Sequence, residues 1–177
     1  MICDHNDYVE ALASAGVKVI SLTAVDKFPD GQFVEDTALC LPEAAILMRP
    51  GAPSRLGEVR EIEPQLRDLF EAVYEIEKPG HIEGGDILVT GKEILVGRSA
   101  RTNQNGVSQL SEIVTPLGYV MREVFTPPEI LHFKTDCSLL GPDEILSTKR
   151  LQNSGCFDGY QVTNVADGEE AAANACL

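Results

Sequence analysis

The chain has 177 residues and a formal net charge of −14, and 44% of its residues are hydrophobic. This length and composition fit one domain with a substantial core, and the negative charge argues against nucleic acid or an anionic membrane surface as partner. The sequence shows no apolar run of membrane-spanning length and no signal-peptide pattern, and its five cysteines have no paired spacing. We therefore expect a cytoplasmic protein with reduced thiols.

Short strands and amphipathic helices alternate along the chain. In chain order we predict a helix at residues 4–15, strands at 17–22, 33–41 and 44–49, a helix from Pro53, strands at 72–77, 86–90 and 93–97, a helix at 103–115, strands from Gly118 and at 136–140 and 144–147, a short helix at 148–154, a strand at 160–165 and another from Ala171. Pro64 falls inside the second helix, where it should cause a kink or a restart.

The order helix, strand, strand, strand recurs about three times at a spacing of roughly 40–55 residues, which is typical of stacked or radial repeats. Such units close on one another when a ring is complete. This chain opens with a helix that lacks preceding strands and stops inside a predicted strand. We therefore expect residues 1–177 to form a single partial domain, a ring that is open at both ends.

Acidic residues precede a buried-looking run within residues 28–55. Asp30, Glu35 and Asp36 lie among apolar and turn-forming residues, and Arg49 and Arg55 flank a Pro-Gly-Ala-Pro sequence. Acids in this setting need a cationic partner. One interpretation is that they cap turns and form internal salt bridges with the two arginines. The other is that they line a pocket for a guanidinium or ammonium group.

Four further clusters fall at strand ends or loops, where functional sites often lie. One of them, residues 163–174, ends in a Gly-Glu-Glu-Ala-Ala-Ala-Asn run. Glu83 and Asp86 surround a glycine pair that lets backbone approach a ligand closely. Arg98 and Arg101 lie at a helix start, and an arginine there can bind a carboxylate through two hydrogen bonds. His132 stands in an apolar setting before a strand, where a histidine is more often a hydrogen-bonded structural residue than a catalyst.

Together these segments resemble the dimethylarginine dimethylaminohydrolases, members of the guanidine-modifying, arginine-deiminase-like superfamily. The matching segments are FPDGQFVEDTA (28–38), RPGAPSR (49–55), EGGD (83–86), VGRSARTNQNG (96–106), LHFK (131–134) and EEAAANA (169–175). They cover nearly the whole chain in the family's order. Lys134 stands where an arginine deiminase would be expected to have an acid, which favours the dimethylarginine branch.

The resemblance implies an α/β fold, a five-bladed α/β propeller of the pentein type, incomplete here with its ring open. It makes His132 the general acid and base, with Glu83 as the acid that orients and charges it. The substrate-binding residues it implies are Asp30 for the α-amino group, Glu35 and Asp36 for the guanidinium, and Arg55 and Arg101 for the α-carboxylate.

The activity that the resemblance implies is hydrolysis of the guanidinium C–N bond of N-omega-methylated arginine to citrulline and dimethylamine or methylamine. A cysteine thiolate attacks in this family, and no metal or cofactor is needed. The family's cysteine is expected beyond Leu177 and its first strand before Met1, and Cys176 is interpreted as a core residue. We therefore expect this chain by itself to bind a cationic small molecule without turning it over.

Other interpretations stay open. The chain could be an arginine-deiminase-like hydrolase, a non-catalytic module that binds arginine-like cations, or a folded remnant without a ligand. An open ring leaves strand edges and an apolar face uncovered, which predicts self-association.

Overall fold

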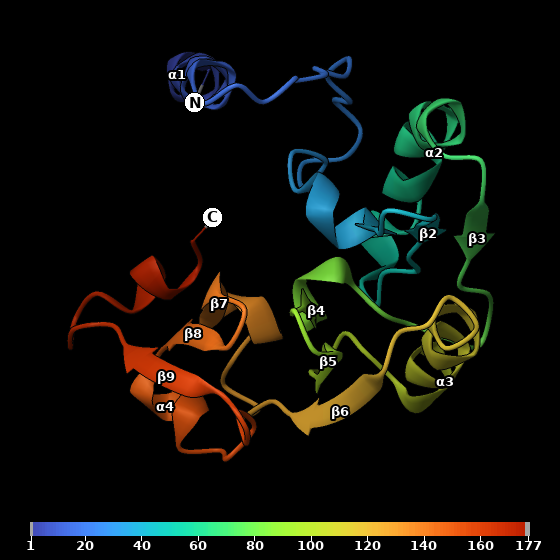
Figure 1. Ribbon diagram of the computed structural model, residues 1–177. Helices are drawn as coiled ribbons and strands as arrows, with labels where there is room; N and C mark the ends of the chain where they lie inside the picture. Colours follow the sequence, from blue (N-terminus) through green and yellow to red (C-terminus); the bar gives the residue numbers. More distant parts are fainter. Residues whose placement is uncertain (1, 176–177) are drawn as a thin grey trace.

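The computed structural model describes residues 2–175, with side chains from Asp4 onward, as an α/β structure with three separate sheets. The three sheets follow one another along an arc, and the first helix, α1 (Ile2–Ser14), stands away from the rest of the molecule (Figure 1). The chain is similar to a row of modules, each built from one sheet. No helix within the described residues has both the length and the apolar character that crossing a membrane requires.

Each sheet contains three strands with the same topology. The strands are β1 (Ala38–Cys40), β2 (Ala45–Leu47) and β3 (Val73–Glu75); β4 (Ile87–Val89), β5 (Ile94–Arg98) and β6 (Met121–Phe125); β7 (Cys137–Gly141), β8 (Glu144–Ser147) and β9 (Gln161–Asn164). In every sheet the first strand pairs antiparallel with the second, and the second pairs parallel with the third. The predicted alternation of helices and strands is therefore confirmed from β1 onward, whereas the first predicted unit lacks its strand at residues 17–22.

A helix connects the second and third strands of each unit, because parallel neighbours require a crossover. These helices are α2 (Glu58–Leu69), α3 (Gln104–Val114) and α4 (Lys149–Gln152). Helix α2 continues through Pro64 without a restart. Its apolar face, which includes Val59 and Leu66, packs with Leu47 of β2, and this packing holds the helix in place although Pro64 lacks a backbone donor.

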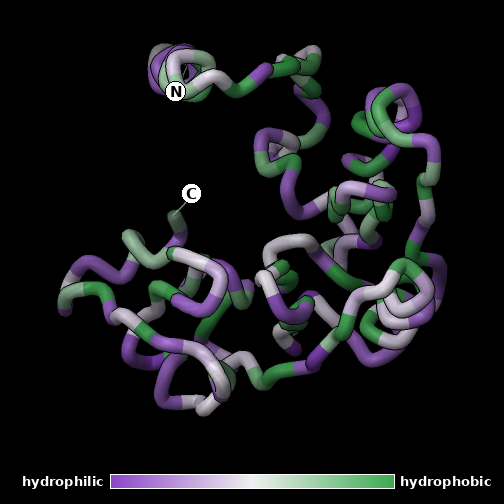
Figure 2. Tube along the Cα trace, viewed as in Figure 1, coloured by the Kyte–Doolittle hydropathy of each residue, from purple (hydrophilic) through white to green (hydrophobic). Residues whose placement is uncertain are grey.

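The second sheet is buried on both faces. Ile94 and Val96 of β5 pack with Leu110 of α3 in a core that also contains residues of the first sheet. Leu95, which points to the opposite face of the same strand, packs with Ile145 of β8 in a second core. Neighbouring units therefore share hydrophobic cores, and hydrophobic segments recur along the trace through the strands (Figure 2).

Two predicted strands at the ends of the chain are wrong. Residues 17–22 belong to no strand in the described part of the chain, and Val17, Ile20 and Leu22 are exposed. A strand needs a hydrogen-bonding neighbour, and the first sheet consists of β1, β2 and β3 alone. At the other end Glu170–Ala173 form a 3₁₀ turn, η5, instead of a strand.

Short 3₁₀ turns occupy corresponding positions before the first strand of each unit. They are η1 (Val34–Thr37), η3 (Gly84–Asp86) and η4 (Phe133–Thr135). A further turn, η2 (Pro53–Arg55), precedes α2. Turn η3 contacts both η1 and η4. The segments that carry the predicted site residues therefore meet where the three units adjoin.

Candidate active site

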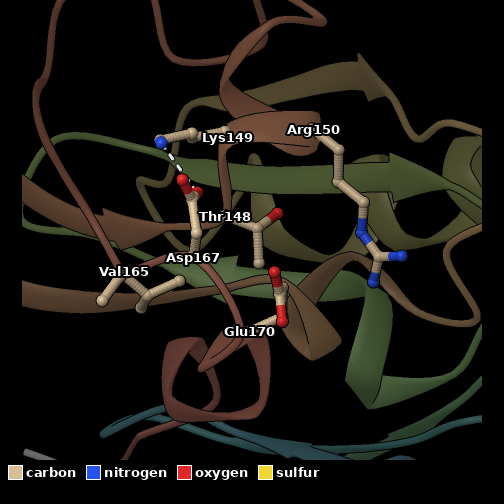
Figure 3. A pocket seen from close by; sticks show the side chains of 7 residues that line it. Thr148, Lys149, Arg150, Val165, Asp167 and Glu170 are labelled. Carbon is tan, nitrogen blue, oxygen red and sulfur yellow. Dashed lines mark hydrogen bonds and ion pairs between the residues drawn. The ribbon is translucent and has the colours of Figure 1, made fainter.

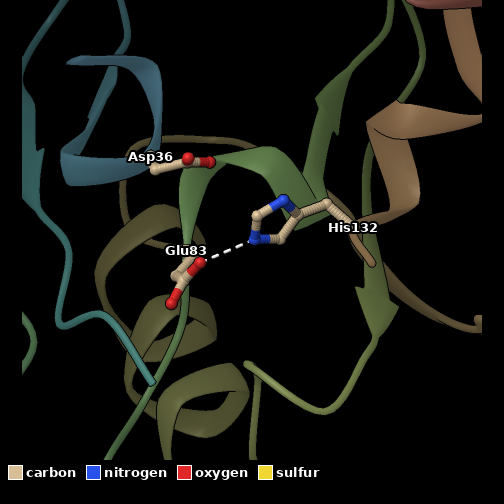
Figure 4. A group of neighbouring side chains, drawn as sticks. All are labelled: Asp36, Glu83 and His132. Atoms are coloured by element: carbon tan, nitrogen blue, oxygen red, sulfur yellow. Dashed lines mark hydrogen bonds and ion pairs between the residues drawn. The ribbon is translucent and has the colours of Figure 1, made fainter. Parts of the chain in front are cut away.

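Asp36, Glu83 and His132 converge at the meeting point of the three turns. Asp36 lies in η1, Glu83 immediately precedes η3, and His132 immediately precedes η4. One ligand atom from each side chain lies within 4.8 Å of the others. The imidazole of His132 points at Glu83, with the Asp36 carboxylate close by (Figure 4). Residues separated by about one repeat in sequence thus form one cluster.

Glu83 is fully buried and accepts several hydrogen bonds. Its Oε2 lies 2.6 Å from His132 Nε2. Its Oε1 accepts from the backbone amide of Gly51 at 2.8 Å, from that of Ala52 at 3.4 Å, and from Arg101 Nη1 at 3.4 Å. Burial raises the pKa of Glu83, but the hydrogen bond and charge of His132, together with Arg101, hold it below its usual value. Glu83 is therefore an anion that faces the histidine.

Burial and the neighbouring acids shift the pKa of His132 in opposite directions. Burial disfavours the imidazolium and lowers its pKa, whereas the hydrogen bond to Glu83 and the charges of Asp36 and Asp86 raise it. The net result is a pKa of His132 above its ordinary value. The raised pKa favours the protonated imidazolium, the form that a general acid needs.

The glycine pair between Glu83 and Asp86 allows this close approach. A Cβ on Gly84 would lie 2.0 Å from the carbonyl oxygen of Glu35. A Cβ on Gly85 would lie 2.6 Å from Asp36 Oδ1 and 2.9 Å from His132 Cγ. The backbone amide of Gly85 also donates to Asp36 Oδ1 at 2.9 Å. Glycine is required at both positions because a side chain would occupy the space where the turns meet.

Asp36 also forms an internal salt bridge. Arg55 Nη1 donates to Asp36 Oδ2 at 2.6 Å, and Arg55 Nε donates to Glu58 Oε2 at 2.9 Å. Arg55 is buried, and its Nη2 donates to the carbonyl oxygens of Asp30 and Phe33. The interpretation as an internal salt bridge is therefore confirmed for Asp36 and Arg55, although Asp36 faces the His132 cluster as well.

The same interpretation is wrong for Arg49. Within the described residues its guanidinium pairs with no carboxylate and instead donates to His81 Nδ1 at 2.8 Å and to the carbonyl oxygen of Gly80 at 3.2 Å. The backbone carbonyl of Arg49 accepts from the amide of Ile82. This antiparallel bridge carries Arg49 toward residues 80–82 and away from the acids of η1.

Asp30 and Glu35 lie outside the cluster. Both are exposed. The carbonyl oxygen of Asp30 accepts from Arg55, and the carboxylate of Glu35 forms an ion pair with Lys134 Nζ at 2.6 Å. This ion pair links η1 to η4, the same two turns that position Asp36 and His132. Glu35 and Lys134 therefore connect the two sides of the site at its surface.

The spacing of Asp36, Glu83 and His132 would also suit a metal ion. Each carboxylate, however, already has a cationic partner, since Asp36 pairs with Arg55 and Glu83 contacts Arg101 and His132. A metal would have to displace these partners. The donor set fits an ion-pair network better than a vacant metal site, and the prediction that no metal or cofactor is needed stays a prediction.

The three thiols that the structure describes have raised pKa values. Burial raises the pKa of Cys156 and raises that of Cys137 well above its usual value, and partial burial of the sulfur raises that of Cys40, a residue that is otherwise exposed. Cys137 donates its thiol hydrogen to the carbonyl oxygen of Phe133. A nucleophilic cysteine needs a lowered pKa, so none of these three is activated. Cys176, predicted to be a core residue, lies outside the described residues.

A surface cavity lies in the third unit. It is lined by Thr148, Lys149, Arg150, Val165, Ala166, Asp167 and Glu170 (Figure 3). Lys149 pairs with Asp167, and Arg150 pairs with the buried Asp136. The two cations of this cavity therefore already have acidic partners. None of its lining residues is a predicted site residue, so the cavity is separate from the cluster of Asp36, Glu83 and His132.

Two acids near the site have roles that the sequence did not reveal. Glu58 is buried against Arg55, and Asp86 is fully buried near His132. Glu58 lies three residues after Arg55 at a helix start, a spacing that could have suggested the pair. The partners of Asp86 come from distant segments, so no local pattern indicated them.

Comparisons with known proteins identify the family of the chain. A family model described as arginine deiminase matches residues 60–170. The chain is 35% identical over 171 residues to the N(G),N(G)-dimethylarginine dimethylaminohydrolase of Pseudomonas aeruginosa, covering 96% of this chain and 67% of that protein. It is 39% identical over 137 residues to the protein of the same name from Streptomyces coelicolor, covering 77% of this chain and 52% of that protein.

Solved structures show the same fold. The Pseudomonas aeruginosa enzyme, as a cysteine-to-serine mutant complexed with citrulline, matches with a TM-score of 0.91 and 35% identity over 96% of this chain and 67% of that one. The N-terminal domain of a cyanobacterial arginine dihydrolase matches with a TM-score of 0.81 over 98% of this chain and 68% of that one. Its identity is only 16%, so that match supports the fold alone.

The family match and the fold place the chain in the arginine-deiminase-like superfamily of guanidine-modifying enzymes. Within this superfamily the chain belongs to the dimethylarginine dimethylaminohydrolase family, and it spans only part of the length of the two relatives named above.

Proposed function

We propose that the protein acts on the guanidinium C–N bond of N-omega-methylated arginine and gives citrulline and dimethylamine or methylamine. The observation that carries this proposal is the 2.6 Å contact between His132 and the buried Glu83, beside Asp36. A histidine that keeps its proton near neutral pH can protonate a departing amine. The names of the two relatives and the citrulline complex support this substrate class.

In this proposal the acids bind the cationic parts of the substrate. Asp36 faces the guanidinium and Asp30 takes the α-amino group, with Glu35 as a second acid at the surface. Arg101 is the main partner of the α-carboxylate, because its side chain is 31% exposed. Arg55 is buried on Asp36, so its larger contribution is to orient that acid.

In the proposed reaction a cysteine thiolate is the nucleophile, and the cluster binds the guanidinium and transfers protons. The thiolate attacks the guanidinium carbon and forms a C–S bond, and the C–N bond to the methylated nitrogen breaks as His132 transfers its proton to the leaving amine. Water then attacks the same carbon of the thiouronium cation and the C–S bond breaks to give citrulline and the thiolate. Of the two protons released, His132 accepts one and the amine product takes the other, so that it leaves as an ammonium ion. Glu83 stabilises the imidazolium at the start and at the end of this cycle.

The proposal extends to features of the whole protein. The two-sided core of the second sheet and the corresponding positions of η1, η3 and η4 support a radial arrangement of units. We propose that these units are blades of a five-bladed α/β propeller with the site at its centre. Self-association and a cytoplasmic location belong to the same proposal.

Calorimetry with asymmetric dimethylarginine tests the substrate class. We expect the chain to bind this cation and Asp36→Asn to weaken binding at least about tenfold, the order of one lost charge-assisted contact. Asp68→Asn is the matched control, because Asp68 is exposed on α2 and does not belong to the cluster of Asp36, Glu83 and His132. Circular dichroism of each variant separates loss of binding from loss of the fold. Absence of binding by the folded wild-type chain would overturn the proposal.

A citrulline assay tests turnover separately. We expect no citrulline above background from the chain by itself, since each thiol that the structure describes has a raised pKa. Release that is abolished by Cys176→Ser would overturn the assignment of Cys176 to the core. Tighter binding of arginine than of dimethylarginine would favour the arginine-deiminase-like alternative, and binding without turnover in any longer form would favour the cation-binding module.

A further inference from the structure

Residues 83–86 form a hub in which each residue contacts a different part of the site. Glu83 contacts His132, Gly84 abuts the backbone of Glu35, and Gly85 donates to Asp36. Asp86 completes the set through partners of its own, which are Ser99, Thr102 and the backbone of Phe133. It is fully buried, and the reaction proposed above assigns it no part.

The carboxylate of Asp86 binds donors from two separate segments. Its Oδ2 accepts from Ser99 Oγ at 2.5 Å and from Thr102 Oγ1 at 2.6 Å. Its Oδ1 accepts from the backbone amide of Phe133 at 2.9 Å. None of these partners is a cation, so the buried charge is held by neutral donors. Such a group is costly to bury unless its hydrogen bonds are complete.

The two segments are the ones that place Arg101 and His132. Arg101 lies between Ser99 and Thr102, and its backbone amide donates to Ser99 Oγ at 3.0 Å. His132 immediately precedes Phe133, whose amide Asp86 binds. The side chains of Arg101 and His132 then reach Glu83 from different directions, at 3.4 Å and 2.6 Å. One carboxylate therefore ties both segments to the turn that follows Glu83, the Arg101 segment through two side-chain hydroxyls and the His132 segment through a backbone amide.

We propose that Asp86 is a positioning residue that sets the places of Arg101 and His132 on the two sides of Glu83. It contacts neither substrate nor reacting atoms. Its hydroxyl partners orient Arg101 toward the substrate carboxylate, and its bond to Phe133 fixes the backbone that presents His132. That Arg101 is aimed at a substrate carboxylate rests on the proposed function. That Asp86 places Arg101 and His132 around Glu83 does not.

Cutting only the link to the Arg101 segment gives the sharpest test. The double variant Ser99→Ala, Thr102→Val removes both hydroxyls and leaves the bond between Asp86 and Phe133 intact. We expect it to weaken binding of asymmetric dimethylarginine about tenfold, the order of one displaced charge-assisted contact. Binding of N,N-dimethylguanidine, which lacks the α-carboxylate, should stay unchanged. The control is Ser108→Ala, Thr115→Val, two exposed positions at α3 and its end.

A conservative variant separates positioning from mere stabilisation. In Asp86→Asn the amide oxygen can accept from Phe133 while the amide hydrogens point to the hydroxyls, which can rotate to accept. The preference for dimethylarginine over dimethylguanidine should therefore survive in Asp86→Asn and be lost in Asp86→Ala. Equal weakening of both ligands in the folded double variant would overturn the proposal.

An NMR titration of His132 keeps the inference testable if neither ligand binds. Displacing the cationic Arg101 from Glu83 should raise the His132 midpoint in the double variant, whereas loss of the Asp86 charge should lower it in Asp86→Asn. If the wild type binds neither ligand but the His132 midpoint shifts as expected in both variants, the proposed function is overturned and the positioning role stands. An unchanged His132 midpoint in the double variant would overturn the positioning role.

Discussion

The carboxylate of Glu83 is fully buried. It accepts hydrogen bonds from two backbone amides, from the Arg101 side chain and from the His132 ring. A carboxylate in this position is stabilised only while those donors remain, and His132 in turn owes its raised pKa chiefly to the hydrogen bond with Glu83, against the opposing effect of burial. The two residues act as one pair, and changing either should be visible at the other.

We expect Glu83→Gln to lower the pKa of His132. An NMR titration of the three histidines measures it, with His5 and His81 as internal references in the same spectra. Glutamine retains an acceptor for the imidazole but removes the negative charge that favours the imidazolium. A His132 curve that is unchanged in the variant would show that Glu83 does not control the histidine.

The same pair makes stability depend on pH. Because the folded pKa of His132 is raised, its contribution is complete below the unfolded value of about 6.5 and is lost as pH rises through the folded pKa. The lowered pKa of Glu83 adds a contribution present above about pH 4.3 and lost as pH falls through its folded value. The stability advantage of wild type over Glu83→Gln should thus be larger near pH 6 than near pH 9.

Among the elements near the site, helix α3 begins directly after the segment that contains Arg101, and Asn103 caps its start. Asn103 Oδ1 accepts from the amides of Gly106 and His81, each at 2.9 Å, and its Nδ2 donates to the carbonyl oxygen of Pro79 at 2.9 Å. A Cβ on Gly106 would lie 2.2 Å from the carbonyl oxygen of His81. The helix end is therefore both capped and pressed against residues 79–81.

We expect Asn103→Ala to lower the free energy of unfolding by about 1–2 kcal/mol, the range for loss of a helix cap. Urea denaturation followed by circular dichroism measures this change. Asn105→Ala is the matched control, because Asn105 is exposed in the first turn of the same helix and has no role as a cap. Equal effects of the two substitutions would show that the contacts of Asn103 contribute nothing to stability.

The whole molecule exposes apolar residues along the segment that joins α1 to the rest of the chain. Val17, Ile20 and Leu22 are between 42% and 51% exposed, and this connection contains hydrophobic positions (Figure 2). The outer strands of each three-stranded sheet also have one unpaired edge within the described residues. Apolar surface together with open strand edges favours association of copies.

We expect sedimentation velocity to show association that grows with protein concentration. Ile20→Lys should weaken it about tenfold, since burying one such side chain contributes on the order of 1.5–3 kcal/mol. Val120→Lys makes the same change at an exposed position near β6 and serves as the control. A monomer at every concentration would contradict the open-ring interpretation.

The sequence alone predicted the repeated strand and helix order, because the periodicity of apolar side chains is local and each unit repeats it. The family resemblance carried by its motifs also predicted a set of acids, arginines and a histidine for the site, of which Asp30 and Glu35 lie outside the cluster. The contacts of Asp36, Glu83 and His132 agree with that grouping, while the roles of these residues stay predictions.

Only the tertiary structure decided which partner each charge takes. Residues 17–22 have the composition of a strand but no neighbour to pair with, and Arg49 pairs with His81 instead of an acid. The sequence pointed to Asp86 beside the glycine pair but not to its partners, because these lie 13, 16 and 47 residues away. Hydrogen bonds and ion pairs depend on distances in space, and local sequence does not specify the distance between segments that different units bring together.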